Sequence, residues 1–228
     1  MHNIPSSQTA IIIGATGLTG SFLTSRLLQE RQYANIRVLV RQPDLHPRQG
    51  LEIVIVDFEN EPALAAAMKG ADVVFCCIGT TIRKAGSQAN FRKVDYDIPV
   101  RCARIAREQG IQQFLLMSSI GANANTRNFY LRTKGEAEQA LLSTGIPAVH
   151  IFRPSVLLGP RKEFRLGETV GQLLIQVFYF LLQGSWRKYR AIKAATVAQA
   201  MINAAAKQET GPHIYESDAI QQLGLYTK

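Results

Sequence analysis

Short apolar runs alternate with amphipathic segments along the chain. Runs of this length, bounded by polar or turn residues, are typical of buried strands, and the segments between them have helical spacing. The predicted strands are Ile11–Ile13, Ile36–Val40, Glu52–Val56, Asp72–Cys77, Gln113–Met117 and Ala148–Phe152. Besides a helix after the first strand, the predicted helices are Glu61–Met68, Asp97–Gln109 and Tyr130–Ser143. This alternation predicts an α/β fold, in which helices cover both faces of a parallel sheet.

The sequence predicts a single domain over residues 1–228. A chain of 228 residues with 46% hydrophobic content can bury a three-layer core, but it is short for two independent domains. Within it, residues 154–228 are expected to carry a small segment that covers the substrate, including an apolar and aromatic helix over 167–182. The longest apolar stretch, Leu173–Leu182, is too short to span a membrane. A two-fold contact would also bury such a helix, so monomer and homodimer stay open.

The turn after the first predicted strand is rich in glycine. Gly14, Gly17 and Gly20 recur at three-residue spacing before an amphipathic segment. In such a unit the first glycine permits a sharp turn, the second lets backbone N–H groups approach a diphosphate, and the third lets the helix lie close to the sheet. The helix N-terminus adds unpaired donors and partial positive charge. A turn that needs glycine for geometry alone is the alternative, but the flanking elements favour a dinucleotide site.

The end of the second predicted strand indicates which dinucleotide is bound. A site for NAD usually places Asp or Glu here against the ribose 2′-hydroxyl, whereas an arginine pairs with the 2′-phosphate of NADP. The strand runs into Arg41, and the first carboxylate after it is Asp44. An arginine at a strand end without a ligand gives the same pattern. We expect NADP(H) as the cofactor.

Two further loops follow predicted strands and belong to the same edge of the sheet. The carboxyl ends of parallel strands form the crevice in which such folds bind ligands. Asp57 would accept a hydrogen bond from the adenine amino group, and Gly79 would admit the ribose and the diphosphate closely. The loop residues expected to line the cofactor are Asp57, Phe58, Ile78, Gly79 and Thr80.

Tyr130 and Lys134 form the candidate acid–base pair. Side chains at i and i+4 project from one face of a helix, so the phenol and the ammonium can point into one pocket. A free tyrosine has a pKa of about 10, and a neighbouring ammonium favours its phenolate. Lys134 would also hold the nicotinamide ribose. Ser118 and Ser119 end the fifth predicted strand, and we assign Ser119 to orient a substrate carbonyl, with Ser118 as the alternative.

The chain resembles the atypical short-chain dehydrogenases/reductases and, within them, the Tat-interacting-protein group of oxidoreductases. The broader resemblance lies in the segments GATGLTG (14–20), MSSIGA (117–122), YLRTK (130–134) and FRPSVLLG (152–159). The narrower resemblance lies in VDFEN (56–60), CCIGTT (76–81), KAG (84–86) and FRPSVLLGPRKEFR (152–165). The resemblance covers nearly the whole chain. The resemblance implies a Rossmann-like, doubly wound parallel sheet that binds NADPH, and a Ser-Tyr-Lys site.

The resemblance also implies further cofactor-binding residues. Gln42 follows Arg41 where members of the group can carry a second basic residue, so selectivity for the 2′-phosphate is expected to be weaker than in a two-arginine site. The GxxGxxG spacing of the turn favours the extended and atypical branches over medium-chain dehydrogenases. The residues implied to line the cofactor are Thr16, Gly17, Leu18, Thr19, Arg41, Ile78, Gly79, Tyr130, Lys134, Leu157 and Arg165.

Together these features predict an NADPH-dependent reduction of a carbonyl group. Hydride would pass to the carbonyl carbon, Tyr130 would protonate the oxygen with help from Lys134, and Ser119 would orient the carbonyl. The apolar and aromatic residues 167–182 predict an apolar or aromatic substrate rather than a nucleotide sugar. Two alternatives stay open: a regulatory NADP sensor with little or no turnover, and an enzyme similar to nucleotide-sugar epimerases. A pure sensor has no need of an acid–base pair.

Charge and cysteine content bear on partners and location. The formal net charge is +9, but the basic residues are scattered, and aromatic and basic residues interleave only at 186–190, so no specific nucleic-acid partner is expected. Cys76, Cys77 and Cys102 lack metal-ligand spacing, so no metal is expected, and their apolar surroundings are typical of reduced thiols. The polar start of the chain does not predict a signal peptide. These features predict a cytoplasmic protein.

Overall fold

A parallel sheet forms the centre of the molecule. The structure, a computed structural model, describes residues 8–30, 32–42, 47–160 and 189–225. In this part of the chain the sheet has seven strands in the order β3-β2-β1-β4-β5-β6-β9, and every neighbouring pair is parallel. The strands are β1 (Thr9–Ile13), β2 (Asn35–Val40), β3 (Leu51–Ile55), β4 (Val73–Cys76), β5 (Gln113–Met117), β6 (Ala148–Arg153) and β9 (Gly211–Glu216).

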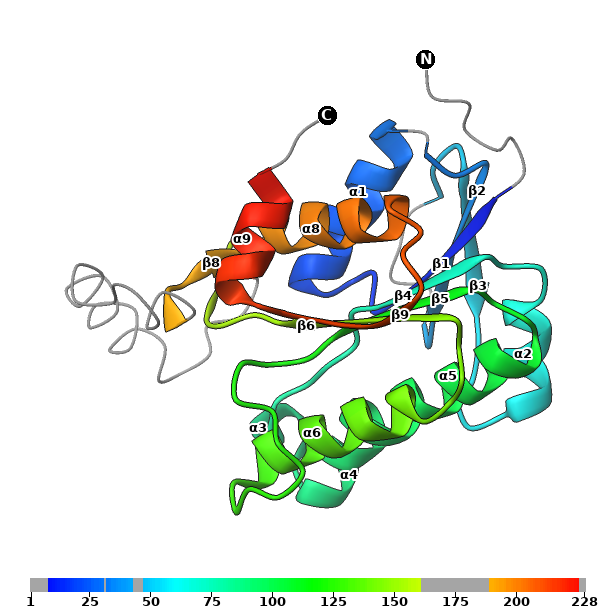
Figure 1. The fold of residues 1–228 in the computed structure, drawn as a ribbon. Helices are drawn as coiled ribbons and strands as arrows, with labels where there is room; N and C mark the ends of the chain where they lie inside the picture. The colour runs from blue at the N-terminus through cyan, green and yellow to red at the C-terminus, as the bar shows by residue number, and fades with distance from the viewer. Residues whose placement is uncertain (1–7, 31, 43–46, 161–188, 226–228) are drawn as a thin grey trace.

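Helices cover both faces of the sheet, as Figure 1 shows. One layer contains α1 (Leu18–Glu30), α8 (Ala194–Ala206) and α9 (Ser217–Leu225), and the other contains α2 (Glu61–Met68), α5 (Ile98–Glu108) and α6 (Phe129–Leu142). Each helical layer packs on its own face of the sheet and forms a separate hydrophobic core with it. Because successive strand side chains point to opposite faces, Ile12 packs in the core beneath α1, α8 and α9, and Ile11 and Ile13 pack in the core beneath α2, α5 and α6. The predicted Rossmann-like α/β fold is confirmed.

The strand order reverses between β1 and β4, which lie side by side although two strands separate them in the chain. In open parallel sheets ligands bind in the crevice at such a reversal, outside the carboxyl ends of the strands. The turns after β1 and β4 both open at this edge, where α1 and α6 also begin (Figure 1). The fold therefore places the glycine turn and the Tyr130–Lys134 pair at one edge.

The predicted elements agree closely with the structure. β5 and α2 have the predicted bounds, and the other predicted strands and helices differ by one residue at one or both ends, except β1, which begins two residues earlier. α5 ends at Glu108, and Gly110 just beyond it has a φ of 73°. A left-handed residue at this place is a common helix stop that glycine accepts without strain.

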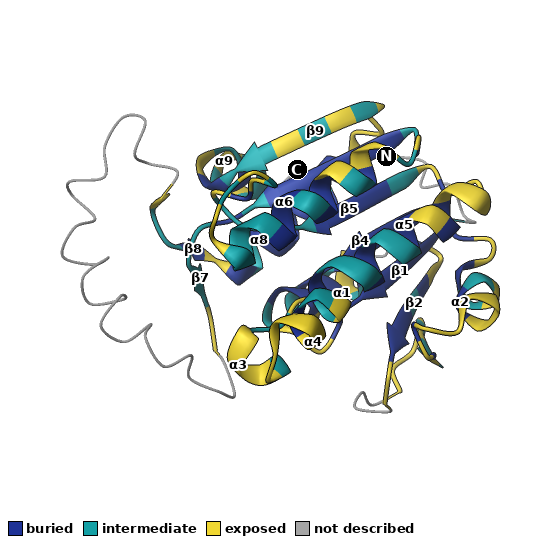
Figure 2. Cartoon of the chain, turned by 90° about the horizontal axis from the view of Figure 1, so that it is seen from below, coloured by how far each residue is buried: buried dark blue, intermediate teal, exposed yellow. Residues whose placement is uncertain are grey.

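Several short elements were not predicted. The helices α3 (Ile82–Ala85) and α4 (Gln88–Arg92) and the π-helical turn η1 (Lys93–Asp97) lie between β4 and α5, and each is too short to show a periodic pattern. Figure 2 shows that α3 and α4 are largely exposed, whereas the central strands are buried. β7 (Leu157–Leu158) and β8 (Ile192–Lys193) pair separately from the main sheet.

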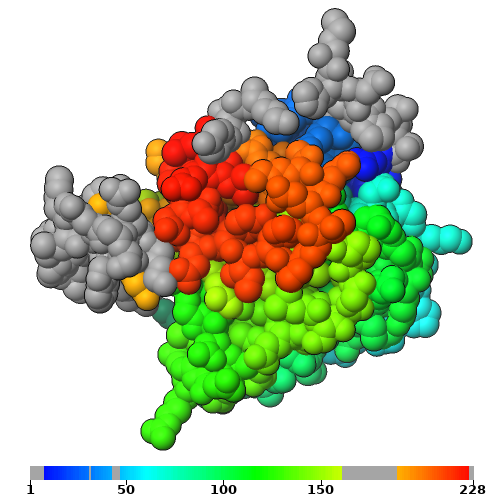
Figure 3. Space-filling model, in the orientation of Figure 1, coloured from blue at the N-terminus to red at the C-terminus, as the bar shows by residue number. Residues whose placement is uncertain are grey.

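The C-terminal part of the described chain completes the sheet. β9 pairs with β6 at the edge, and α8, β9 and α9 form one continuous surface with the middle of the chain in Figure 3. The predicted helix over 167–182 and Arg165 lie outside the described residues. The single domain and its covering segment therefore stay predictions. Within the described residues, no helix is long and apolar enough to cross a membrane.

Candidate active site

Close packing explains two of the three glycines in the turn after β1. Gly14 has a φ of 85°, and a β-carbon on it would lie 2.7 Å from the backbone nitrogen of Ile78. A β-carbon on Gly20 would lie 2.1 Å from the carbonyl oxygen of Gly14. Both distances are far below van der Waals contact, so any larger residue would push α1 and the loop after β4 away from the turn.

The turn fits an anionic ligand. The N–H of Gly17 donates to the carbonyl of Gly14 at 3.0 Å, and Thr16 and Gly17 are exposed. The first backbone N–H groups of α1 have no partner within the helix, and its first turn carries no acidic residue. The hydroxyl of Thr19 is buried and has no hydrogen-bond partner among the described residues. This combination of free donors and a close-packed glycine turn suits a diphosphate.

The loops after β2 and β3 carry two exposed charged residues and one buried aromatic residue. Arg41 is exposed just beyond the end of β2, and Asp57 is exposed after β3. One carboxylate oxygen of Asp57 accepts the N–H of Glu59 at 2.9 Å. Phe58 is only 4% exposed and packs in the core below the sheet, so its side chain supports this loop from inside.

The segment after β6 returns to the start of α1. Leu157 in β7 is half-buried and packs against the core beneath α1 and α8. Two residues on, a β-carbon at Gly159 would lie 2.9 Å from Cδ1 of Leu18. Leu157 and Leu18 are thus brought to the same edge of the sheet, although they are 139 positions apart in the sequence. 

α6 positions Tyr130 and Lys134. The side chain of Asn128 caps this helix by accepting the N–H of Leu131 at 3.1 Å. Tyr130 is half-buried, and Lys134, one turn further, is 5% exposed. Burial alone would lower the pKa of Lys134, but the nearby acidic groups of Asp95 and Tyr130 outweigh it and raise that pKa above its ordinary value. The helix therefore brings the phenol near enough to the ammonium to influence its pKa.

Asp95, in η1, is the buried partner of Lys134. Its Oδ1 lies 2.7 Å from Nζ of Lys134, and its Oδ2 accepts the backbone N–H of Thr80 at 2.9 Å. A β-carbon on Gly79 would lie 3.3 Å from Asp95 Oδ1 and 3.7 Å from Lys134 Nζ. Three elements thus meet at the ammonium. Sequence reasoning missed Asp95, because nothing in the local pattern separates it from Asp97 two residues later.

The two serines after β5 have different surroundings. Ser118 is buried, and its hydroxyl donates to a carboxylate oxygen of Glu138. Glu138 also accepts Nε of Arg153 at 3.0 and 3.2 Å. Ser119 is half-buried, and its hydroxyl has one long contact of 3.4 Å, to the carbonyl of Ile120. Ser118 is therefore held in a buried hydrogen-bond network, whereas the hydroxyl of Ser119 is available to bind another group.

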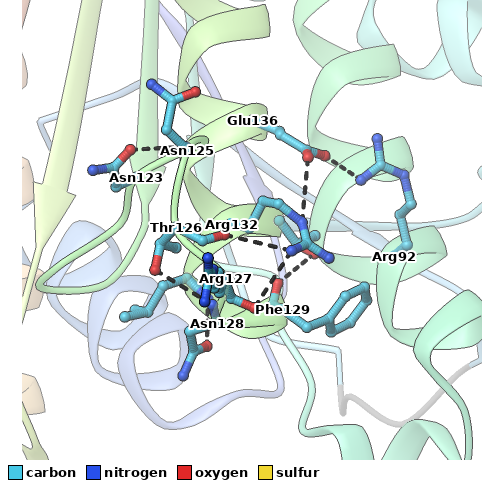
Figure 4. Close-up of polar contacts among 11 residues, drawn as sticks. Arg92, Asn123, Asn125, Thr126, Arg127, Asn128, Phe129, Arg132 and Glu136 are labelled. Atoms are coloured by element: carbon cyan, nitrogen blue, oxygen red, sulfur yellow. Dashed lines mark hydrogen bonds and ion pairs between the residues drawn. The ribbon is translucent and has the colours of Figure 1, made fainter.

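An arginine on the outer face of α6 holds the loop that precedes this helix, as Figure 4 shows. The guanidinium of Arg132 donates to the carbonyls of Thr126 and Arg127, both at 3.4 Å. Its Nε lies 3.9 Å from the carboxylate of Glu136, which also pairs with Arg92. These contacts link the loop, α6 and α4. The contacts of Arg132 on the outer face and the Asn128 cap together fix the start of α6 and, with it, Tyr130.

The comparisons with known proteins decide the family. The family model described as NAD(P)H-binding matches residues 14–208. The chain belongs to this family. The matched range begins at Gly14 and includes Tyr130 and Lys134, so the family extends over the candidate site.

Curated relatives extend over almost the whole chain. Protein HTATIP2 of Rattus norvegicus is 34% identical and the match covers 96% of this chain and 90% of the relative. Protein FMP52, mitochondrial, of Debaryomyces hansenii is 31% identical, with coverage of 89% and 90%. The resemblance to the Tat-interacting-protein group of atypical short-chain dehydrogenases/reductases is confirmed.

The expected cytoplasmic location is contradicted by these relatives. Three FMP52 proteins, from Debaryomyces hansenii, Candida albicans and Scheffersomyces stipitis, are named mitochondrial. The expectation rested on reduced thiols and a polar start. Cys76, Cys77 and Cys102 are free and buried, and buried thiols are compatible with either compartment, so cysteine usage could not separate the two.

A solved structure shows the same fold. MoeE5 in complex with UDP-glucose and NAD superposes with a TM-score of 0.69 at 14% identity, covering 95% of this chain and 80% of that one. This likeness shows that the two proteins share a fold.

Proposed function

We propose that the protein is an NADPH-dependent oxidoreductase that reduces a carbonyl compound through Ser119, Tyr130 and Lys134. One observation carries this proposal: the buried, charged Lys134 lies one helical turn from Tyr130, next to the loop after β4, where the strand order of the sheet reverses. Buried lysines are rare unless they are paired, and perturbed ionisable groups gather at functional sites. The site therefore has the parts needed to move a proton at a reacting oxygen.

The dinucleotide would be held along the carboxyl ends of β1 to β5. When bound, NADPH would supply a hydride for the substrate carbon. The exposed guanidinium of Arg41 would pair with the 2′-phosphate, and Lys134 would hydrogen-bond the nicotinamide ribose. The residues proposed to hold the cofactor are Gly14, Thr16, Gly17, Leu18, Thr19, Gly20, Arg41, Asp57, Phe58, Ile78, Gly79, Thr80, Tyr130, Lys134, Leu157 and Arg165.

The protein's own side chains would handle the proton. Tyr130 gives its phenolic proton to the carbonyl oxygen of the substrate and takes another from solvent afterwards. The ammonium of Lys134 stabilises the phenolate that is left. Ser119 donates a hydrogen bond to the same oxygen, since Ser118 is already bonded to Glu138.

An apolar or aromatic carbonyl compound is the proposed substrate class. Support comes from the sequence of residues 167–182, which is apolar and aromatic. A screen that follows NADPH absorbance across quinones, aromatic aldehydes, steroids, hydroxy-ketones and nucleotide sugars tests both the activity and the class. Turnover of the apolar compounds is expected. Preferential turnover of nucleotide sugars contradicts the substrate class, and binding of NADPH without turnover of any compound favours the sensor.

Cofactor choice provides an independent test. Arg41→Ala removes a charge-assisted pair and should weaken NADPH binding by about 1.5–3 kcal/mol, roughly tenfold to a hundredfold, while NADH binding changes little. Fluorescence titration with both cofactors measures this. Arg107→Ala removes the same charge from an exposed position on α5 and serves as the control. Equal affinities of the parent protein for NADPH and NADH contradict the choice of NADP.

A further inference from the structure

We propose that Asp95 is a positioning residue of this site, which keeps Lys134 charged and ties it to the loop after β4. Asp95 is 2% exposed and uses both carboxylate oxygens, one on Lys134 and one on the N–H of Thr80. An uncompensated ammonium at this depth would lose much of its hydration without replacement. The carboxylate supplies that replacement and fixes where the charge lies.

The π-helical turn explains how Asp95 reaches the ammonium. η1 (Lys93–Asp97) inserts between α4 and α5, and it packs against α6. Such turns widen a helix locally and are found at functional sites. Asp97, two residues on, is only half-buried and makes no side-chain cap for α5. The turn thus separates two aspartates that look alike in the sequence, and sends one of them to the site.

The ionisable groups that influence Lys134 come from three elements. Asp95 lies on η1, Tyr130 on α6 and the thiol of Cys76 at the end of β4. Burial raises the pKa of Cys76 to about 12, so this thiol stays neutral up to strongly alkaline pH. Among the described residues that influence Lys134, Asp95 is therefore the one whose carboxylate balances the ammonium at neutral pH.

Removing the carboxylate has a pH-dependent consequence for stability. In the parent protein the pKa of Lys134 is raised, so its contribution is fully present below the unfolded pKa of about 10.4 and lost only above it. In Asp95→Asn, burial without a counter-charge places the folded pKa of Lys134 below the unfolded value. This variant therefore carries a stability penalty that is fully present below the folded pKa of Lys134 and fades as the pH rises toward the unfolded pKa of about 10.4.

The decisive experiment uses the protein without cofactor. Urea unfolding of the parent, Asp95→Asn and the control Asp97→Asn is measured at about pH 7 and about pH 10. The lowered urea midpoint of Asp95→Asn should recover toward the parent at the higher pH and in the double variant Asp95→Asn/Lys134→Met, whereas Asp97→Asn should show no such recovery. A deficit that is the same at both pH values, or unchanged in the double variant, overturns the proposal.

Two further arms keep the test decisive. If Asp95→Asn does not fold at about pH 7, the double variant is expected to fold there, and an unfolded double variant overturns the proposal. The link to the cofactor rests on the proposed function and is measured as NADPH affinity by fluorescence titration. Affinity of Asp95→Asn should fall about tenfold between about pH 7 and about pH 10 as Lys134 loses its proton, while the parent changes little.

The two proposals fail in different ways. Lys134→Met that binds NADPH as tightly as the parent shows that the proposed contact of Lys134 with the cofactor is wrong, and the unfolding result still decides the role of Asp95. If Lys134→Met weakens NADPH binding but Asp95→Asn follows the parent at every pH, Asp95 does not act on the site and the inference is overturned.

Discussion

The inner and outer faces of α6 carry the same kinds of charge in different surroundings. On the inner face Lys134 and Glu138 are 5% and 3% exposed, and they bind partners from other elements of the fold. On the outer face the side chains of Arg132 and Glu136 are 39% and 30% exposed. Exposed pairs contribute little because water competes for both ions, whereas breaking a buried pair leaves an unpaired charge. Burial, rather than the kind of residue, decides which ion pairs the site depends on.

The inner face also determines the geometry of the site. Lys134 is anchored to η1 through Asp95, and Glu138, four residues later, is anchored to the ends of β5 and β6 through Ser118 and Arg153. Both anchors lie at the carboxyl edge of the sheet. These two anchors fix α6 and therefore also fix the position of Tyr130 in its first turn.

Substitution of Glu138 should show most clearly that the two faces of α6 differ in their contribution to stability. Glu138→Gln leaves the guanidinium of Arg153 without its carboxylate, and it should lower the free energy of unfolding by about 3 kcal/mol. The matched change Glu136→Gln on the outer face should lower it by about 0–1 kcal/mol. Urea unfolding measures both. Equal losses for the two variants would show that burial does not distinguish the faces.

Substitutions of the two serines should have different effects because only Ser118 is hydrogen-bonded to Glu138. Ser119→Ala should reduce turnover about a hundredfold with little change in stability, since it removes a donor to the reacting oxygen. Ser118→Ala should reduce stability by about 1 kcal/mol and affect turnover less. Steady-state kinetics and thermal unfolding of both variants check this. A larger loss of turnover in Ser118→Ala reverses the assignment.

The buried imidazole of His150 extends the comparison to the other side of the sheet. The pKa of His150 is lowered to about 4, by burial first and then by His213 and Lys207. The unfolded chain takes up this proton near pH 6.5 and the folded one does not, so stability should fall as the pH drops from about 6.5 to about 4. His150→Phe should weaken that fall. Tyr215→Phe, which removes the contact of 3.3 Å to His150 but keeps the imidazole, should retain it.

Local patterns were sufficient to predict most of the fold. Apolar runs and helical spacing located β5 and α2 at their observed bounds, because both elements bury regular faces. β9 was not predicted. It is an edge strand whose middle residues include Pro212 and the exposed Ile214, so it lacks the continuous apolar run of the central strands.

The candidate site could be predicted only in part. The spacing of Tyr130 and Lys134 and the glycine turn are local signals, and they indicated the correct edge of the sheet. Asp95 and Glu138 were missed because their partners are fixed by packing between elements that are distant in the chain. Sequence spacing carries no information on which of several carboxylates such packing will bury.

Turnover and cofactor binding measured together in Tyr130→Phe separate an enzyme from a sensor. The change removes one proton donor and little else, so NADPH affinity should stay within about twofold of the parent. Reduction of the best substrate from the carbonyl screen should fall by at least about a hundredfold, and Tyr96→Phe, which removes a phenol from η1, should leave it unchanged. A Tyr130→Phe protein that reduces this substrate at the parent rate contradicts the account.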